Sequence, residues 1–343
     1  MISRVRALSF LFVLAAACSG ASSFAQDGTL RERIRERLQQ RQPQNARMAS
    51  ERDASSPITK PGDYSFTIDH GGLARSYLVH VPRSYDPATP TPLLMAFHGG
   101  GGNMRFQADD QHYGLISKSE SAGFIAVFPN GYSRFPEGRL ATWNAGTCCA
   151  QARDKDIDDV GFVRAVVANV KRQLDVDARH IYATGMSNGG MLTYRLACEL
   201  TDVFSGIAAV AATDNTRRCS PSRAIPVLEI HARDDDHVLF NGGAGAGAFR
   251  DESQVSDFRS VPETISRWTG RNGCTAPPVR VLEVPGAYCE RYSGCRDGVA
   301  VQLCVTETGG HSWPGARQVR DGKAPASQAI SADDVMWDFF GRH

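Results

Sequence analysis

Residues 181–191 read Ile181-Tyr182-Ala183-Thr184-Gly185-Met186-Ser187-Asn188-Gly189-Gly190-Met191. The first four residues form a short apolar run of strand length, and the residues after the glycines favour a helix. The glycines on both sides of the serine allow a strand and a helix to approach closely through a strained turn. The stretch therefore predicts a strand, a sharp turn and a helix, with Ser187 at the turn. An ordinary glycine-rich turn is the alternative.

The segments on both sides of this turn alternate in the same way. Segments of helical character separate the short apolar runs, which are nearly continuous and therefore typical of strands covered on both faces. This alternation predicts an α/β architecture with a mostly parallel central sheet and helices on both faces. The expected strands lie at 76–81, 93–97, 124–128, 181–184, 207–211, 225–230, 279–284 and 299–306, and the expected helices at 111–122, 159–174, 190–200 and 262–272.

Ser187 has the sequence context of a nucleophile. Its five-residue pattern is G-x-S-x-G, which in a strand–turn–helix context exposes a serine hydroxyl at the edge of a sheet. A serine hydroxyl is a weak nucleophile at neutral pH and needs an adjacent base. In this arrangement the acid and then the base follow the serine along the chain. The histidines that follow Ser187 are His231, His237, His311 and His343.

His311 is the expected general base. It lies in a glycine-rich loop directly after the apolar run 299–306, where the sheet should end. His343 is the last residue, and His231 and His237 lie in the segment that should supply the acid. A surface histidine in a loop is the alternative interpretation of His311.

The expected acid follows the strand at 225–230. Asp234, Asp235 and Asp236 are consecutive there, and a carboxylate at this place would fix the tautomer of the base and stabilise its protonated form. Spacing alone does not separate the three, and two of them are expected to be solvated charges of the loop.

A second glycine-rich loop is expected to bind the oxyanion. The run 93–97 leads into His98-Gly99-Gly100-Gly101-Gly102-Asn103. Glycines let backbone N–H groups approach a substrate oxygen, so one donor should come from Gly100 or a neighbour and the other from the N–H of Asn188. His98 precedes the serine and is expected to make structural hydrogen bonds. A flexible linker is the alternative interpretation.

The N-terminal segment has the features of a secretory signal. Arg4 and Arg6 precede an apolar stretch at 8–17 that is too short to span a bilayer, and residues 23–25 offer small side chains for cleavage before Gln26. The alternatives are an uncleaved anchor and lipidation at Cys18. Residues 26–60 are predicted to be a basic, Gln- and Arg-rich disordered tail, and residues 61–343 a single catalytic domain.

Cysteine usage agrees with export. Without Cys18 the chain keeps eight cysteines, and an even number in an exported chain indicates disulfides. Asp297-Gly298 predicts a turn, around which Cys289 and Cys304 are placed symmetrically, leaving Cys274 for Cys295. No C-x-x-C pair is present in the sequence, so zinc and thioredoxin-like chemistry lack support.

Six motifs together resemble a known family. They are His98–Asn103, Thr142-Trp-Asn-Ala-Gly-Thr-Cys-Cys149, Asp158-Asp-Val-Gly-Phe162, Gly185–Gly190, Asn272-Gly-Cys274 and Gly310-His-Ser-Trp-Pro-Gly315. From about residue 62 to 343 the chain resembles the secreted polyhydroxybutyrate depolymerase and feruloyl esterase group, close to carbohydrate esterase family 1. The resemblance implies the α/β-hydrolase fold and serine ester hydrolysis.

The resemblance also implies roles for particular residues. The family pattern H-G-x-x-D aligns with His231-Ala232-Arg233-Asp234-Asp235 and selects Asp235, with Ala232 departing from the usual glycine and Asp234 as the runner-up. The segment 132–159 is implied to border the active site, with Trp143 and Trp313 as walls for an acyl group; ordinary buried aromatics are the alternative. Asp158 and Asp159 are expected to cap the following helix.

The adjacent pair Cys148-Cys149 is expected to pin this segment through Cys198 or Cys219, with a bridge between the two neighbours as the alternative.

The sequence therefore predicts a secreted serine esterase that acts through an acyl-enzyme. The expected site is Ser187, Asp235 and His311, with Gly100 and Asn188 at the oxyanion, no metal and no organic cofactor. The substrate is a small or oligomeric ester, of feruloyl, acetyl or short hydroxyalkanoate type. The 38 basic and 37 acidic residues balance, which gives no reason to expect nucleic acid or an anionic membrane as partner. The oligomeric state stays open. A serine peptidase of the same fold and a non-catalytic secreted binding protein are the competing hypotheses.

Overall fold

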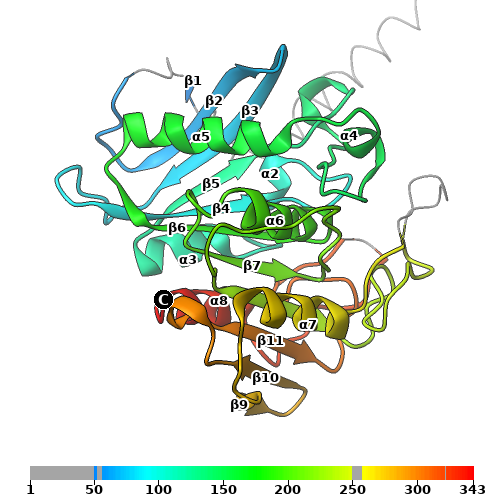
Figure 1. Cartoon of the computed structure of the whole chain (residues 1–343). Helices are drawn as coiled ribbons and strands as arrows, with labels where there is room; N and C mark the ends of the chain where they lie inside the picture. Colours follow the sequence, from blue (N-terminus) through cyan, green and yellow to red (C-terminus); the bar gives the residue numbers. More distant parts are fainter. Residues whose placement is uncertain (1–49, 52–55, 249–256, 321) are drawn as a thin grey trace, which may run out of the picture. The chain divides into compact units, whose positions relative to one another are not determined.

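The computed structural model describes residues 50–51, 56–248, 257–320 and 322–343. The expected signal segment, 1–25, lies outside the described residues. An 11-stranded sheet runs through the described part, in the order β1-β2-β3-β5-β4-β6-β7-β8-β11-β10-β9 (Figure 1). The strands are β1 Ser50–Glu51, β2 Gly62–His70, β3 Leu73–Val81, β4 Thr91–Phe97, β5 Ile125–Pro129, β6 Val176–Met186, β7 Gly206–Val210, β8 Val227–Ala232, β9 Val279–Val284, β10 Ala287–Tyr292 and β11 Val301–Thr306.

The centre of the sheet is parallel, as the alternating pattern predicts. Strands β5, β4, β6, β7, β8 and β11 pair in parallel, and antiparallel hairpins β2–β3 and β9–β10 lie toward the two edges. Parallel strands direct their carboxyl ends to one edge of the sheet. The loops after β4, β6, β8 and β11 therefore meet at one edge, which is where the candidate site lies.

Helices cover both faces of the sheet. On one face lie α5 (Asp159–Gln173), α6 (Asn188–Glu199) and α7 (Val261–Asn272), which cross in front of the sheet in Figure 1. On the other face lie α3 (Leu115–Ala122) and α8 (Ala332–Phe340), which contact each other. Shorter helices are α2 Met104–Gln107 and α4 Ala150–Asp154, with 3-10 turns at Pro136–Gly138 and Arg296–Gly298. Within the described residues no helix has the length and apolar character needed to span a membrane.

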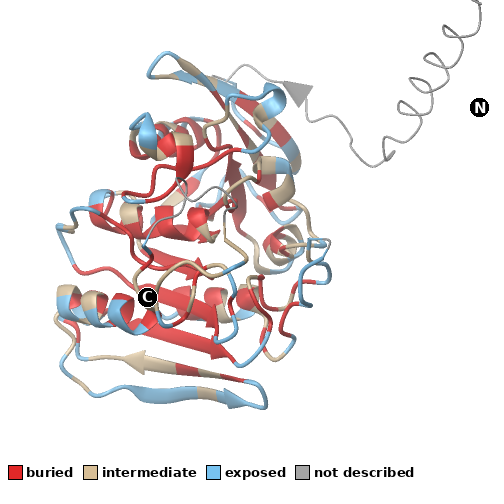
Figure 2. Ribbon diagram, turned by 90° about the vertical axis from the view of Figure 1, so that its right-hand side faces the viewer, coloured by how far each residue is buried: buried red, intermediate tan, exposed pale blue. Residues whose placement is uncertain are grey.

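Two hydrophobic cores result from the alternation of side chains along the strands. In β4, Leu93, Met95 and Phe97 enter the core under α5, α6 and α7, whereas Leu94 and Ala96 enter the core under α3 and α8. Figure 2 shows the central strands buried and the edge strand β9 largely exposed, with β10 partly buried beside it. Burial on both faces explains why the central strands are continuous apolar runs in the sequence.

The elements differ from the sequence-based expectations mainly at their ends. The helix expected at 111–122 begins only at Leu115, because Gly114 adopts a left-handed conformation before it. The sequence prediction omitted α8, whose N-cap is Ser331. The tail expected at 26–60 is also too long: Ser50–Glu51 pairs with β2, and Ile58 is buried, with its N–H donating to the carbonyl oxygen of Gln173 at 2.8 Å.

All eight cysteines outside the N-terminal segment are paired. Cys289 faces Cys304 across β10 and β11, and Cys274 pairs with Cys295, as the hairpin argument predicts. The expectation that Cys198 or Cys219 holds the Cys148-Cys149 pair is wrong. Cys198 and Cys219 pair with each other, because the segment between β7 and β8 brings Cys219 back to the end of α6, and Cys148 bridges its neighbour Cys149, the alternative named above.

Candidate active site

Ser187 lies at the sharp turn between β6 and α6. Its backbone has φ 56° and ψ −124°, a region that costs energy for a residue with a side chain and is typical of functional turns. The N–H of Ser187 donates to Val210 on β7 at 2.9 Å, and its carbonyl accepts from Met191 at 2.8 Å. The turn is therefore held from both the sheet and the helix while the side chain stays partly exposed.

The neighbouring glycines are required by close packing. A Cβ at position 185 would lie 2.6 Å from the backbone of Gly189, and a Cβ at 189 would lie 2.6 Å from the carbonyl oxygen of His98. Real Cβ atoms do not approach other atoms this closely. The G-x-S-x-G pattern thus has a steric cause in this chain.

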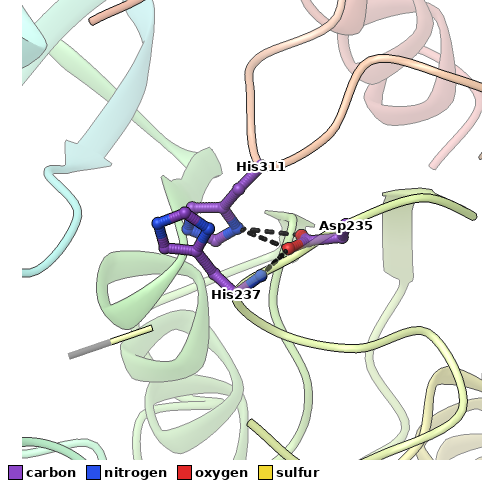
Figure 3. A group of neighbouring side chains, drawn as sticks. All are labelled: Asp235, His237 and His311. Atoms are coloured by element: carbon purple, nitrogen blue, oxygen red, sulfur yellow. Dashed lines mark hydrogen bonds and ion pairs between the residues drawn. The ribbon is translucent and has the colours of Figure 1, made fainter. Parts of the chain in front are cut away.

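Asp235 and His311 form a hydrogen-bonded pair beside this turn. Asp235 follows β8 and His311 follows β11, two strands that pair in parallel. His311 Nδ1 lies 2.8 Å from Oδ2 and 3.1 Å from Oδ1 of Asp235 (Figure 3). The backbone N–H groups of His237 and Val238 donate to Asp235 Oδ1 at 2.8 and 3.0 Å. Burial alone would raise the pKa of Asp235, but His311 and His231 hold it well below its usual range.

The three consecutive aspartates have different surroundings. Asp235 is buried, whereas Asp234 and Asp236 are exposed. Asp234 Oδ1 accepts from the N–H of Gly310 at 2.8 Å and so holds the loop that carries His311. Asp236 Oδ1 lies 2.5 Å from His237 Nδ1. Only Asp235 of the three contacts the imidazole of His311 in the described structure.

The ring of His237 stacks on the ring of His311. The ring centroids are 4.3 Å apart and the planes differ by 10° (Figure 3). His237 Nε2 lies 3.1 Å from Lys323 Nζ. Burial and the neighbouring His311 lower the pKa of His237, which favours an uncharged ring against the expected base.

Three side chains here have donor atoms close enough to consider a metal site. Asp235, His237 and His311 offer atoms that all lie within 4.8 Å of one another. However, Asp235 and His311 already face each other at hydrogen-bond distance, and His237 Nδ1 faces Asp236. This arrangement fits a pair that shares a proton, as the sequence analysis expects.

The glycine loop after β4 lies against Ser187. A Cβ at Gly99 would lie 3.5 Å from the Cβ of Ser187, and Gly99 and Gly100 line the same cavity as Ser187. His98 supports the loop from beneath: its Nδ1 lies 2.9 Å from Gly99 O, and its Nε2 accepts from the N–H of Gly131 at 2.9 Å. Burial lowers the pKa of His98 to about 4, so the ring is neutral and structural, as predicted.

The prediction that Trp143 forms a substrate wall is wrong. Its side chain is fully buried, and its Nε1 donates to His98 O at 2.9 Å. The side-chain amide of Asn188 makes paired hydrogen bonds with the backbone of Trp143, at 2.7 and 3.0 Å. The segment 132–159 thus packs behind the glycine loop and contributes no residue to the cavity lining among the described residues. The motif around Trp143 supports the oxyanion loop rather than the substrate.

Asp158 and Asp159 have separate roles in this supporting layer. Asp158 caps α5 by accepting from Gly161, as predicted. The expectation that Asp159 caps this helix is wrong: its carboxylate is fully buried, lies 2.6 Å from Arg75 Nη2 and accepts from the N–H of Asn144 at 2.8 Å.

A cavity of about 250 Å³ opens beside Ser187 and His311. Its apolar wall includes the aromatic side chains of Phe106, Tyr113 and Trp313, with Tyr113 and Trp313 edge to face at 5.4 Å. The lining also includes the polar side chains of Gln318, Arg320 and Lys323, with Arg320 over the ring of Phe106 at 4.7 Å. An engineered cavity of about 150 Å³ is known to hold benzene, so this one is large enough for an aromatic acyl group.

Trp313 is held rigidly in that wall. Its Nε1 donates to Asp333 Oδ1 at 3.1 Å, from the first turn of α8. Burial raises the pKa of Asp333 to about 7.

Sequence comparison finds curated esterases. The chain is 31% identical to a putative esterase, NocK, of Nocardia uniformis over 258 residues, which are 71% of this chain and 72% of that protein. It is 30% identical to a probable feruloyl esterase C of Aspergillus clavatus over 78% of this chain and 83% of that protein. The chain belongs to the feruloyl esterase family of carboxylic ester hydrolases.

Further comparisons of sequence and structure bear on this esterase. It is 30% identical to feruloyl esterase B of Piromyces equi over 69% of its own length, but spans only 42% of that protein. No family model matches the chain.

An acetyl xylan esterase from Aspergillus awamori superposes with a TM-score of 0.52 over 78% of this chain and 94% of that chain, at 15% identity, which confirms the α/β-hydrolase fold. A putative dipeptidyl aminopeptidase IV of Bacteroides ovatus gives the same TM-score at 14% identity, so the fold alone does not separate esters from amides.

Sequence reasoning missed several residues of this esterase's site. Phe106 and Tyr113 line the cavity from the segment after the glycine loop, and Arg320 and Lys323 line it from the segment after His311. Their positions directly behind the two glycine-rich motifs were the available signal. His231, on β8, reaches Asp235 from inside the sheet, and Glu229 on the same strand contacts His231. Only the buried position of that strand identifies these two residues.

Proposed function

We propose that this esterase cleaves its substrate through an acyl-enzyme on Ser187. Ser187 Oγ attacks the ester carbonyl while His311 Nε2 takes its proton, because Nδ1 of that ring is engaged by Asp235. His311 then returns the proton to the leaving alcohol, and water repeats the cycle on the acyl-enzyme. The N–H groups of Gly100 and Asn188 bind the oxyanion, and removing one such donor typically costs 10²–10³ in kcat.

The preferred substrate is an ester of an aromatic acid, of the feruloyl type, with a hydroxylated alcohol. The aromatic wall beside Ser187 carries this proposal, because stacked and edge-on aromatic contacts favour a planar acyl group. The polar lining residues Gln318, Arg320 and Lys323 offer donors to the hydroxyl groups of a carbohydrate alcohol. Relatives named feruloyl esterase agree with this assignment.

Two measurements test the proposal. A fluorophosphonate probe should label the folded chain at Ser187, and Ser187→Ala should abolish both labelling and turnover, whereas Ser121→Ala, at an exposed serine on α3, should keep both. Unchanged labelling of Ser187→Ala would remove this serine from the mechanism.

Parallel assays on methyl ferulate, p-nitrophenyl acetate, hydroxybutyrate oligomers and peptide amides should show the highest kcat/KM for methyl ferulate. Preference for a peptide amide would make the chain a peptidase.

We also propose export to the periplasm or the extracellular medium. The basic and apolar features of residues 1–25 support a cleaved signal. The pairing of all eight cysteines after residue 25 supports an oxidising compartment.

A further inference from the structure

A chain of buried polar side chains lies behind Asp235, on the side away from the cavity. Glu229 and His231 are both on β8 and both fully buried. Tyr194 Oη, on α6, donates to Glu229 Oε2 at 2.6 Å, and Glu229 Oε1 lies 2.8 Å from His231 Nδ1. The ester-cleaving steps proposed above use none of these three side chains.

The other nitrogen of His231 points to the expected acid. His231 Nε2 lies 2.8 Å from the carbonyl oxygen of Val238 and 3.4 Å from Asp235 Oδ2. A carbonyl oxygen only accepts hydrogen bonds, so Nε2 carries a proton. Nδ1 of His231 faces Oε1 of Glu229, and the other oxygen of that carboxylate accepts from Tyr194. This arrangement favours a proton on Nδ1 as well.

We propose that His231 is a protonated positioning residue that holds Asp235 from behind, and that Glu229, supported by Tyr194, is the anion that keeps it protonated. This inference rests on the proposed roles of Asp235 and His311. Both oxygens of Asp235 are then occupied: Oδ1 by two backbone N–H groups, and Oδ2 by imidazoles on two sides. The carboxylate has no free rotation while His311 gains and loses its proton.

Charge balance supports the same arrangement. With Glu229 and Asp235 ionised and His231 protonated, the buried cluster carries one net negative charge while His311 is neutral, and none once His311 has taken the serine proton. Burial alone would lower the pKa of His231, but Asp235 and Glu229 outweigh it and raise that pKa to about 10. Burial also raises the pKa of Glu229, and the hydrogen bonds from His231 and Tyr194 oppose that rise and favour the ionised carboxylate. The cluster is therefore electrically neutral in the protonated state that catalysis must stabilise.

The other groups around His231 do not compete for its proton. The Phe240 ring packs edge-on against the imidazole, with centroids 6.0 Å apart. Beyond Tyr194, the carboxylate of Asp214 is paired with Arg271 from α7. His311, across Asp235, is the remaining titratable neighbour.

Nitrogen NMR of histidine-labelled protein tests the protonation state without any turnover. At pH 8 one imidazole should show both ring nitrogens protonated, and His231→Gln should remove that signal. A neutral tautomer for this ring at pH 8 would overturn the proposal. This readout stays valid even if Ser187 proves not to be the nucleophile, so the two proposals fail separately.

The pH dependence of kcat/KM tests the positioning role. Without the positive charge of His231, more negative charge faces His311, so the acid limb should move to higher pH in His231→Gln, by about one unit. In Glu229→Gln, which keeps a side chain of the same shape, His231 loses the anion that keeps it protonated. The limb should therefore move in the same direction as in His231→Gln, but by less, because a negative charge is removed together with the positive one. Tyr194→Phe, with both charges retained, should move it least.

A purely structural role would lower kcat in these variants and leave the acid limb in place, and this result would contradict the proposal. A move of the acid limb to lower pH in either variant would do so too. Thermal unfolding of each variant checks that it folds. If His231→Gln does not fold, the Glu229→Gln profile and the NMR signal of the unmodified chain still decide.

Discussion

At the scale of single residues, neighbours of identical chemistry perform different tasks because of where each side chain points. Asp234 holds the loop of the expected base through Gly310, whereas Asp235 faces the imidazole itself. Trp143 and Trp313 differ in the same way: the first fixes the glycine loop and the second lines the cavity. Residue type thus identifies candidates, and direction within the fold assigns the task.

The two aspartates make a matched pair for substitution. We expect Asp235→Asn to lower kcat about 10²–10⁴-fold, because an amide can donate to Nδ1 and favour the wrong tautomer of His311. Asp234→Asn keeps an oxygen that accepts from Gly310 and should stay within a few fold of the unmodified enzyme. Steady-state kinetics on methyl ferulate measures both, and a larger loss in Asp234→Asn would move the acid to that residue.

At the scale of elements, the site depends on how closely α6 packs on β4 and β6. Gly185 and Gly189 allow that approach, and the strained conformation of Ser187 is held by hydrogen bonds to β7 and within α6. The helix N-terminus that results lies beside the cavity, where it favours negative charge.

Two glycines in helices separate this packing effect from helix propensity. Gly189→Ala should prevent the native contact between α6 and β4 and yield little folded protein, because a Cβ there would overlap the backbone of Phe97 and His98. Gly270→Ala, on the exposed face of α7 with no atom within 4 Å of the added Cβ, should raise the free energy of unfolding by about 0.5–1 kcal/mol. Denaturant unfolding measures both. A folded, stable Gly189→Ala would show that the close approach is not required.

At the scale of the whole described domain, one edge of the parallel sheet collects the site. The loops after β4, β6, β8 and β11 bring together segments from residue 98 to residue 311. Disulfides tie the parts that flank this edge: Cys198–Cys219 joins α6 to the loop that leads toward β8, and Cys289–Cys304 joins β10 to β11.

The disulfides predict a graded stability. Cys198 and Cys219 are 21 residues apart, and a bridge over such a loop typically contributes about 3 kcal/mol by restricting the unfolded chain. We expect the double variant Cys198→Ala, Cys219→Ala to lose about that much free energy of unfolding. The matched double variant of Cys148 and Cys149 closes no long loop and should lose less. Equal losses in denaturant unfolding would argue against the loop-entropy explanation.

The sequence by itself determined the alternating architecture, the turn at Ser187, the glycine loop at His98–Asn103 and the hairpin cysteines. These features depend on local periodicity and on backbone conformations that only glycine tolerates, so they are visible in short stretches. Spacing left the three aspartates open, and the family resemblance selected Asp235, the one that faces His311 in the structure. Tertiary structure alone decided that Trp143 lies beneath the oxyanion loop, how Cys148 and Cys198 pair, and that His231 reaches Asp235. Each of these depends on the direction of a side chain relative to residues far away in the chain. Local patterns of polarity in the sequence do not determine that direction.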